Sequence, residues 1–396
     1  MSNTTTLSAN TRATLLLCGR FGERNSEARP LNKREFHELD HALEACNLVP
    51  KNILEMSAAE LKLVGVTHGI SSKRLDGLMG RSADLEQTIE AWTEAGIWVL
   101  GERDPQYPRR LHQRLTSARP PLLFGAGVID YLDMGGVCIV GSRASRDLAL
   151  QFSANLGSRC AREGLTVISN DMRGVDREVV SAALDGSGRA IMVLSDRLEK
   201  AVGAKRYREA LADNRLTMVT PFSPNTAFSV ANAIRVNRYQ YVLSDVAVIV
   251  ETRRKGGIWT GADENRIEKW VPAFVRADQP MSPGNRALLH LGHQAITQKD
   301  VENIDSLSEF FISQAGKHVD GPAQPVVSAD ELDPPTDLYS FFLAEFQAIA
   351  KTAAKSETYI MKHFDIERAQ ARKWLGRAVA EGAAKKTGGQ TRYIST

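Results

Sequence analysis

A glycine, two hydroxyl side chains and an arginine follow directly on an apolar run in VCIVGSRASRD, at 137–147. A glycine after a strand lets the backbone turn tightly, and the next N–H groups point outward at the positive end of a helix. Ser142, Arg143 and Ser145 would add side-chain donors. The pattern predicts an anion pocket of a kind that suits phosphate. The alternative is that Gly141 serves only the turn and that Arg143 is solvated.

A second loop of the same kind is predicted within ISNDMRGVDREVVSAAL, at 168–184. This segment also ends a strand and opens a helix. Arg173 and Gly174 fall in the loop, and Asp176 is placed to cap the helix or to orient Arg173. Two adjacent strand ends would therefore present arginines at the same edge of a sheet.

Two later segments add cations and glycines to this set. Asn237 and Arg238 lie on a predicted helix that leads to a strand ending at Glu251. After that strand, the cations of RRKGG at 253–257 precede a glycine pair that suits close approach of another backbone. The predicted phosphate-binding residues are Gly141, Ser142, Arg143, Ser145, Arg173, Gly174, Asp176, Asn237, Arg238, Lys255, Gly256 and Gly257.

The elements that must hold these loops follow an alternating pattern from about residue 136 to about residue 295. Six apolar runs rich in β-branched residues, VCIVGS, LTVIS, RAIMVL, LTMVT, DVAVIVE and VPAFV, alternate with helical segments. Continuous apolar strands separated by helices indicate a mostly parallel sheet covered on both faces. We therefore expect an α/β, Rossmann-like fold, in which ligands bind where strand ends meet helix starts.

Segments on both sides of this domain have other patterns. Short helices fill the first hundred residues, and Asn32 followed by Glu35 predicts a capping box. The segment KHVDGPAQPVVSADELDPP holds four prolines and four acids, as a linker does. The expected division is a helical N-terminal domain at 1–105, the Rossmann-like domain at 106–316, the linker at 317–335 and a C-terminal domain at 336–396.

The C-terminal domain carries a basic excess. Residues 351–396 hold ten Lys or Arg against four Asp or Glu, although the whole chain has a net charge of only +3. Three predicted helices, the last between Asp365 as N-cap and Gly382, precede a hairpin turning at 388–389, which makes a winged helix. Duplex or phosphate contact, protein docking and a merely solvated basic face are the alternatives. The candidate DNA contacts are Arg368, Arg372, Lys373, Arg377, Lys385, Lys386 and Arg392.

Other classes of protein find little support. No apolar run approaches the roughly 18 residues of a membrane span, and the N-terminus lacks a signal-peptide pattern, so we expect a cytoplasmic protein without membrane attachment. The four cysteines show no CxxC spacing. HELDH at 37–41 satisfies HExxH, but no third ligand accompanies it. We therefore expect no metal, no cofactor and no catalytic residues.

The order of the phosphate motifs resembles that of the DNA-processing protein A family (DprA, also called Smf). GSR-x-x-S is followed by S-x-x-x-RG-x-D, by NR…LSD…VE and by a GG turn before WTGA. The resemblance covers about Tyr107 to Ile296, and more loosely the two flanking domains. It implies a Rossmann-like domain that binds single-stranded DNA through its phosphates, self-associates and hands DNA to a RecA-type recombinase.

The resemblance also implies roles for single residues. The first phosphate loop matches at Gly141, Ser142, Arg143 and Ser145, the second at Arg173, Gly174 and Asp176, and the third at Asn237 and Arg238. The chain departs from the family pattern at Asn170, where the family has Gly, and at Val236, where it has Arg. The helix after the second loop also lacks the family's histidine. Fewer cations imply weaker or different DNA contact.

These observations predict a single-stranded DNA-binding protein of DNA processing and recombination, and not an enzyme. We expect it to protect single-stranded DNA and load a RecA-type recombinase, in natural transformation and DNA uptake or in defence against foreign DNA. We also expect a homodimer or higher oligomer, and duplex DNA as a ligand of the winged helix.

The alternative is a nucleotide-binding or nucleotide-hydrolysing Rossmann-like sensor that uses the same pocket. The turn GGIWTGADE is similar to the PGG-x-GT-x-x-E loop of such domains, and Glu251, Asp263 or Glu264 would supply the carboxylate. Here Lys255 replaces the proline and the second Gly-Thr is displaced to 259–260, which argues against hydrolysis.

Overall fold

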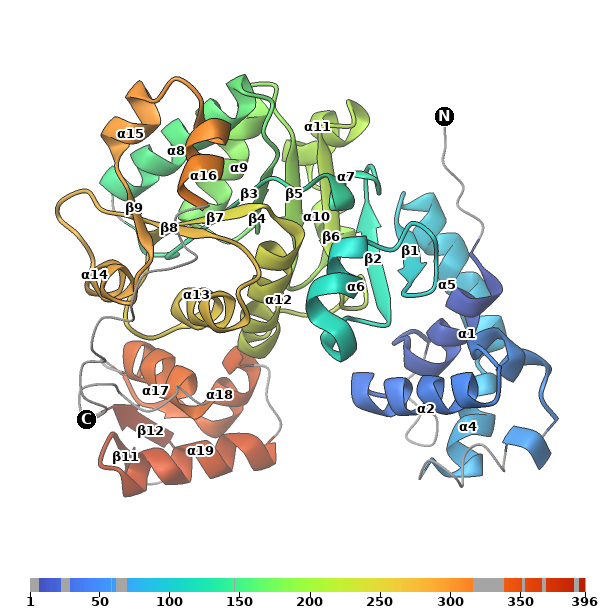
Figure 1. Ribbon diagram of the computed structural model, residues 1–396. Coiled ribbons are helices and arrows are strands. Elements are labelled where there is room, and N and C mark those ends of the chain that lie inside the picture. Colours follow the sequence, from blue (N-terminus) through green and yellow to red (C-terminus); the bar gives the residue numbers. More distant parts are fainter. Residues whose placement is uncertain are drawn as a thin grey trace.

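The structure is a computed structural model that describes most of the chain. The described residues are 7–22, 29–57, 59–61, 70–145, 147–315, 338–350, 353–364, 368–387 and 392–395. The expected linker, Asp365 and the expected hairpin turn lie outside them. The described part contains a large nine-stranded sheet and a three-stranded one (Figure 1). None of its helices is long and apolar enough to cross a membrane.

The large sheet has the strand order β1-β2-β6-β5-β4-β3-β7-β8-β9. Its strands are β1 (Trp98–Gly101), β2 (Leu122–Ala126), β3 (Val137–Gly141), β4 (Val167–Ser169), β5 (Ala190–Val193), β6 (Leu216–Thr220), β7 (Val246–Glu251), β8 (Ala273–Arg276) and β9 (Gln294–Ile296). The strands from β3 to β9 pair in parallel, and β1 and β2 are antiparallel. The six apolar runs all form strands, so the mostly parallel α/β sheet is confirmed.

Helices cover both faces of this sheet, which explains why its central strands carry apolar residues on both sides. In β3, Val137 and Ile139 pack into one core, while Cys138 and Val140 pack into the other. The first face carries α8 (Asp147–Arg162), α9 (Val175–Asp185), α10 (Leu198–Val202), α11 (Arg208–Ala212), α15 (Gln298–Asn303) and α16 (Leu307–Ala315). The second carries α6 (Arg109–Leu115), α7 (Tyr131–Met134), α12 (Val230–Leu243), α13 (Gly257–Glu268) and α14 (Pro283–His290).

The N-terminal helices share a core with the large sheet. They are α1 (Ala9–Cys18), α2 (Lys33–Ala45), η1 (Pro50–Glu55), α4 (Ser72–Met79) and α5 (Ser82–Glu94). The capping box of Asn32 and Glu35 at the start of α2 is confirmed. Leu15 of α1 and Trp92 of α5 belong to the core on the first face, while α2, η1 and α4 enclose a smaller core. The expected boundary near residue 105 stays a prediction.

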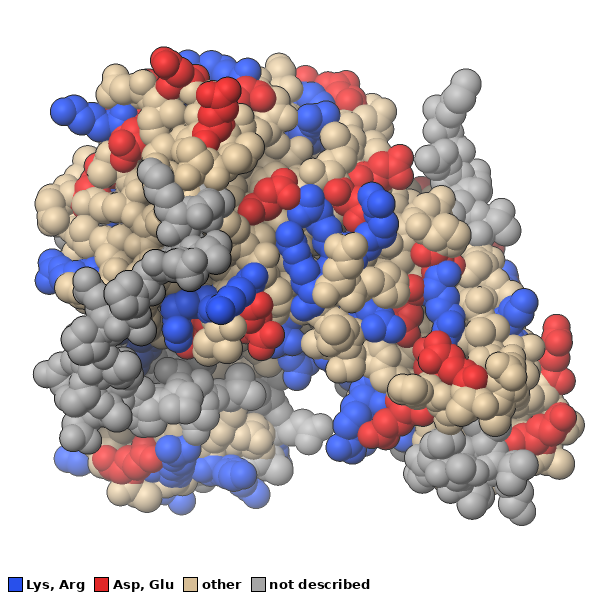
Figure 2. Space-filling view, viewed as in Figure 1, with Lys and Arg blue, Asp and Glu red and all other residues tan. Residues whose placement is uncertain are grey.

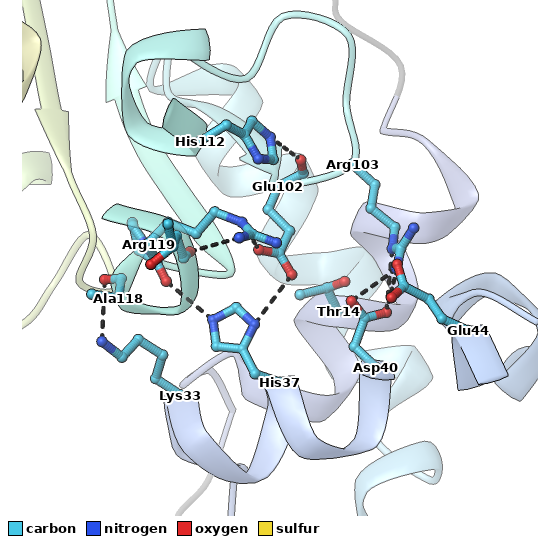
Figure 3. A network of polar contacts seen from close by, with 12 residues as sticks. Thr14, Lys33, His37, Asp40, Glu44, Glu102, Arg103, His112, Ala118 and Arg119 are labelled. Atoms are coloured by element: carbon cyan, nitrogen blue, oxygen red, sulfur yellow. Dashed lines mark hydrogen bonds and ion pairs between the residues drawn. The ribbon is translucent and has the colours of Figure 1, made fainter. Parts of the chain in front are cut away.

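Polar contacts fasten α1 and α2 to the segment after β1. Asp104 accepts hydrogen bonds from the hydroxyls of Ser8 and Thr11, both at 2.6 Å. Figure 3 shows a second group, in which the buried Glu102 carboxylate accepts from Arg119 at 2.7 Å. His37, from the HELDH motif, lies between them, with Nε2 3.2 Å from the Arg119 carbonyl oxygen and Nδ1 3.7 Å from Glu102. This histidine therefore belongs to the junction between the N-terminal helices and the segment that follows β1.

The C-terminal domain has the expected three helices and two hairpin strands. It consists of α17 (Leu338–Ile349), β10 (Lys355–Ser356), α18 (Glu357–Phe364), α19 (Arg368–Ala380), β11 (Ala384–Thr387) and β12 (Arg392–Ser395). The short strand β10 was not expected, and it pairs with β12 to give the order β10-β12-β11. Phe342, Phe346, Ile360 and Leu375 are buried in its core.

Candidate nucleic-acid interface

The predicted phosphate loops meet at the point where the direction of the chain through the sheet changes. From β3 the chain moves through β4 and β5 to β6, and it then returns through α12 to β7, on the other side of β3. Such a switch point opens a crevice at the carboxyl ends of the two strands. Here the loop after β3 is tied to β7, because the Ser142 N–H donates to the Glu251 carbonyl oxygen at 2.9 Å.

The loop after β3 also lies in backbone contact with the loop after β4. Gly174 has a φ of +88°, and a Cβ at this position would stand 2.5 Å from the Ser142 carbonyl oxygen. Gly141 is equally close to α9, since its Cβ would stand 2.5 Å from a methyl group of Val175. Both glycines are therefore required by close packing, and the first two predicted loops form one continuous surface.

Asp176 lies beneath this surface. It is only 4% exposed, and its carboxylate accepts a hydrogen bond from the Gly141 N–H at 3.2 Å. Burial raises the pKa of Asp176 to about 7, although the Gly141 N–H and the nearby Arg143 act in the opposite direction. The expectation that Asp176 caps α9 is wrong, because Gly174 is the N-cap residue and the helix has no side-chain cap. Its described contact joins the two loops and does not orient Arg173.

Arg143 stands at the exposed rim of the first loop. Its guanidinium carbon lies 5.1 Å from the ring centre of Phe228, in the segment before α12. Ser145 is half-buried, and its hydroxyl oxygen has no hydrogen-bond partner among the described residues. Arg173 is exposed on the neighbouring loop. A cation, a ring and an unpaired hydroxyl thus border the same end of the sheet.

Asn237 holds the start of α13 in place. It is 6% exposed, and its side-chain amide donates to the Gly257 carbonyl oxygen at 2.7 Å. The helix begins after Gly256, which has a φ of +116° and makes no side-chain cap, while Lys255 is exposed before it. Because α9 also begins without a side-chain cap, two helix starts present their first N–H groups near the carboxyl ends of the strands.

Arg238 is already engaged by a carboxylate. Its guanidinium donates to Glu264 of α13 at 2.6 Å, and both side chains are less than a third exposed. Burial raises the pKa of Glu264, while Arg238 lowers it. Both residues were candidates for the pocket in the sequence analysis. Their pairing was not predicted, because they lie 26 residues apart in the chain. Part of the charge that Arg238 could offer to a phosphate is therefore neutralised.

Sequence reasoning missed three side chains near this region. Phe228 packs against Arg143, and Arg235 lies one helical turn before Arg238 on α12. Lys33 of α2 is close enough to Arg235 and Arg238 for their charges to lower its pKa, after the larger effect of burial. The spacing of Arg235 and Arg238 on one helix could have revealed the first arginine, whereas no sequence signal linked Lys33 or Phe228 to the site.

Two of the predicted DNA-contacting cations of the C-terminal domain share one carboxylate. Arg368 and Arg372 lie 3.3 Å and 3.1 Å from the Glu357 carboxylate, which is 13% exposed. Arg377 pairs with Glu381 at 2.7 Å and covers the ring of Tyr339. The remaining predicted cations are all exposed, and they are Lys373, Lys385, Lys386 and Arg392.

Basic side chains also gather on one face of the molecule. Figure 2 shows Lys and Arg side chains over α6 and α13 and at the near end of α2, with Asp and Glu side chains among them. The described ion pairs of α6 and α13 are Arg109–Asp133, Arg110–Asp245, Arg238–Glu264 and Arg266–Asp263. The face is therefore basic but partly compensated.

A family model of known proteins matches the part of the chain that carries this site. The model of DNA recombination-mediator protein A covers residues 98–308, which is more than half of the chain. The chain belongs to this family. The matched region begins at β1 and contains every predicted phosphate loop, so the DprA resemblance seen in the motifs is confirmed.

Individual members of the family are distant from this chain. Protein Smf of Synechocystis sp. is 28% identical over 142 residues, which are 34% of this chain and about a third (35%) of that relative. DNA processing protein A from Streptococcus pneumoniae has a TM-score of 0.55 and 18% identity, covering 76% of this chain and 100% of that one, and thus shares the fold. DNA processing protein A from Helicobacter pylori, described for its single-stranded DNA binding mode, has a TM-score of 0.45 and 21% identity over 56% and 96% of the two chains.

Proposed function

We propose that this protein binds single-stranded DNA through its phosphates at the carboxyl edge of the large sheet. The observation that carries this proposal is the backbone contact between Gly174 and Ser142, which joins two loops into one surface. Arg143 and Arg173 border that surface, and Lys255 lies across the switch point. Several cations spread over three loops suit a chain of phosphates better than a single phosphate group.

The chemistry of the surface is indifferent to base sequence. Backbone N–H groups and guanidinium groups recognise phosphate oxygens, which are the same at every nucleotide. The ring of Phe228 beside Arg143 would offer a stacking surface to any base. In this proposal, Asp176 and Asn237 are buried positioning residues that keep the loops and the start of α13 in place.

The wider role follows the family. We propose that the protein protects single-stranded DNA and loads a RecA-type recombinase as a homodimer or larger oligomer, in the cytoplasm, during DNA uptake or defence against foreign DNA. We also propose that the C-terminal domain is a winged helix that contacts duplex DNA through its exposed lysines. No enzymatic step is part of this proposal.

Binding of labelled oligothymidylate, measured by fluorescence anisotropy at several salt concentrations, tests the site. The double variant Arg143→Gln/Arg238→Gln should bind at least tenfold more weakly, and its salt dependence should fall by about 0.7 for each lost phosphate contact. Lys269→Gln is the matched control, because this exposed lysine precedes β8 and lies at the opposite edge of the sheet. Equal affinities for the double variant and the control would refute the site.

A second candidate rests on Glu251 at the end of β7. One of its carboxylate oxygens is buried without a hydrogen-bond partner among the described residues, although the Glu251 carbonyl holds the first loop. A carboxylate repels phosphate but accepts hydrogen bonds from the hydroxyls of a nucleotide, which suits the nucleotide-hydrolase alternative. Release of free base from nucleoside monophosphates, abolished by Glu251→Gln, would support it. Absence of release by the wild-type protein would exclude it.

A further inference from the structure

Three donor side chains surround the carboxylate of Asp171, in the second predicted loop. Arg177 of α9 donates to it through Nε at 3.1 Å, and the hydroxyl of Tyr207 donates to it at 2.6 Å. The guanidinium group of Arg206 donates to the other carboxylate oxygen. Arg206 and Tyr207 belong to the short helix η3 (Lys205–Tyr207), which follows α10. One carboxylate therefore ties the loop after β4 to α9 and to η3.

The two arginines keep donors that Asp171 does not use. Arg177 also donates to the Asp171 carbonyl oxygen through Nη2 at 2.9 Å, and its Nη1 has no hydrogen-bond partner among the described residues. The Arg206 side chain is 49% exposed, and the Arg177 side chain is 39% exposed. Two guanidinium groups around one carboxylate leave a net charge of +1. A phosphate can therefore reach these arginines from the solvent while they remain paired with Asp171.

Asp171 is less exposed than the two arginines that it holds. Its side chain is 19% exposed, and Tyr207, which donates to it, is only 3% exposed. Arg206 also covers the ring of Tyr207, with its guanidinium carbon 4.6 Å from the ring centre. A long side chain that is fixed in this way loses less conformational entropy when it binds a ligand. The carboxylate therefore orients two cations, although its own charge repels phosphate.

This group adjoins the surface proposed for DNA. Arg173, which is exposed and has no ion pair among the described residues, lies two residues after Asp171. Gly174 follows, and a Cβ at that position would stand 3.0 Å from the Cα of Arg143. Three residues of chain span at most about 11 Å, so Asp171 lies within that distance of Gly174. Both groups of cations can therefore contact one short strand.

We propose that Asp171 is a positioning residue that holds Arg177 and Arg206 as a phosphate subsite beside Arg173. The subsite binds a phosphate of the single strand that occupies the first two loops, and Asp171 itself touches no DNA. This inference rests on the proposed single-stranded DNA binding. Asp171, Arg177 and Arg206 were not among the predicted contacts, because an acid in a phosphate loop does not by itself suggest a phosphate site.

The sign of the effect of Asp171→Asn separates positioning from simple charge. Loss of a negative charge near a bound phosphate strengthens DNA binding, whereas loss of the group that orients two arginines weakens it. We expect Asp171→Asn to bind an oligothymidylate of about 16 nucleotides about three- to tenfold more weakly, with a salt dependence lower by about 0.7. Arg177→Gln and Arg206→Gln should each cause a similar loss. In the background of Arg177→Gln/Arg206→Gln, Asp171→Asn should cause no further loss.

Asp196→Asn is the matched control. This carboxylate follows β5 at the same edge of the sheet and is 22% exposed, but it faces a single arginine, Arg197, at 3.9 Å. The control variant should bind the strand at least as tightly as the wild type. If Asp171→Asn binds as tightly as Asp196→Asn, or more weakly with an unchanged salt dependence, the inference is wrong.

Two further outcomes are decisive. If the melting temperature shows that Asp171→Asn is unfolded, Arg177→Gln and Arg206→Gln decide, since both arginines reach the surface. Unchanged affinity in both of those variants would overturn the subsite. If the wild-type protein does not bind oligothymidylate, the proposed function fails and this subsite fails with it. If Arg143→Gln/Arg238→Gln weakens binding and the Asp171 variant does not, only the subsite fails.

Discussion

Gly174 lies against the carbonyl oxygen of Ser142 so closely that a Cβ on the glycine would stand 2.5 Å from that oxygen. Two loops that follow different strands are therefore locked together through their backbones. Any ligand that binds one loop is affected by the position of the other. This contact joins the separate cations of the chain into one site.

Gly174→Ala should disturb both loops. Gly164 is the matched control, because its φ of +69° is also positive but nothing lies within 4 Å of its Cβ position. We expect Gly164→Ala to cost about 1 kcal/mol in unfolding free energy and Gly174→Ala about 1–3 kcal/mol more. Urea unfolding measures both losses. Equal losses would mean that the loops are not tightly packed, and oligothymidylate affinity should fall only in Gly174→Ala.

Glu264→Gln should strengthen DNA binding. The change removes the carboxylate that pairs with Arg238 at 2.6 Å, so the whole charge of the guanidinium becomes available to a phosphate. We expect a gain of about two- to fivefold in affinity at low salt, because one partly screened charge is at stake. Asp263→Asn on the same helix is the control, since Asp263 pairs with Arg266. A loss of affinity in Glu264→Gln would show that the carboxylate positions Arg238.

Asp176→Asn should alter how stability depends on pH. Burial raises the pKa of Asp176 from an ordinary 3.8 to about 7 on folding, so the folded protein holds this proton more tightly than the unfolded chain. The resulting stability is present below about pH 4, and it is lost as the pH rises to about 7, by at most about 4 kcal/mol.

The asparagine variant can keep the hydrogen bond from Gly141 without titrating. Its unfolding free energy should therefore fall less between pH 4 and pH 8 than that of the wild type. Asp185→Asn, at the exposed end of the same helix, serves as the comparison. Parallel pH curves for the wild type and Asp176→Asn would show that the carboxyl group is not buried as described.

The C-terminal domain should bind duplex DNA mainly through its strands. Lys385→Gln/Lys386→Gln should weaken duplex binding about tenfold, since both side chains are exposed on β11. Arg368→Gln/Arg372→Gln should cost about twofold, because both guanidinium groups already pair with Glu357. Gel shifts with a short duplex measure the difference. A larger loss of duplex affinity in Arg368→Gln/Arg372→Gln than in Lys385→Gln/Lys386→Gln would place the DNA contact on α19.

Six strands of the large sheet and the location of the phosphate loops could be predicted from the residues alone. The apolar run from Val137 to Val140 predicts a strand buried on both faces, and glycines followed by cations mark where such strands end. The capping box of Asn32 and Glu35 was equally readable. These features are local, because periodicity, turns and caps depend on residues a few positions apart.

The contacts of the polar residues in the site could not be predicted from local sequence patterns. Asp176 was expected to cap α9 or to orient Arg173, and it instead accepts a hydrogen bond from the N–H of Gly141, 35 residues away. Glu264 pairs with Arg238, and Lys33 donates to the carbonyl oxygen of Ala118, 85 residues away. Such contacts depend on how the sheet and the N-terminal helices pack. The sequence can therefore place a cation in a loop. The packing of the elements determines whether that cation pairs with a carboxylate of the protein or can bind a phosphate.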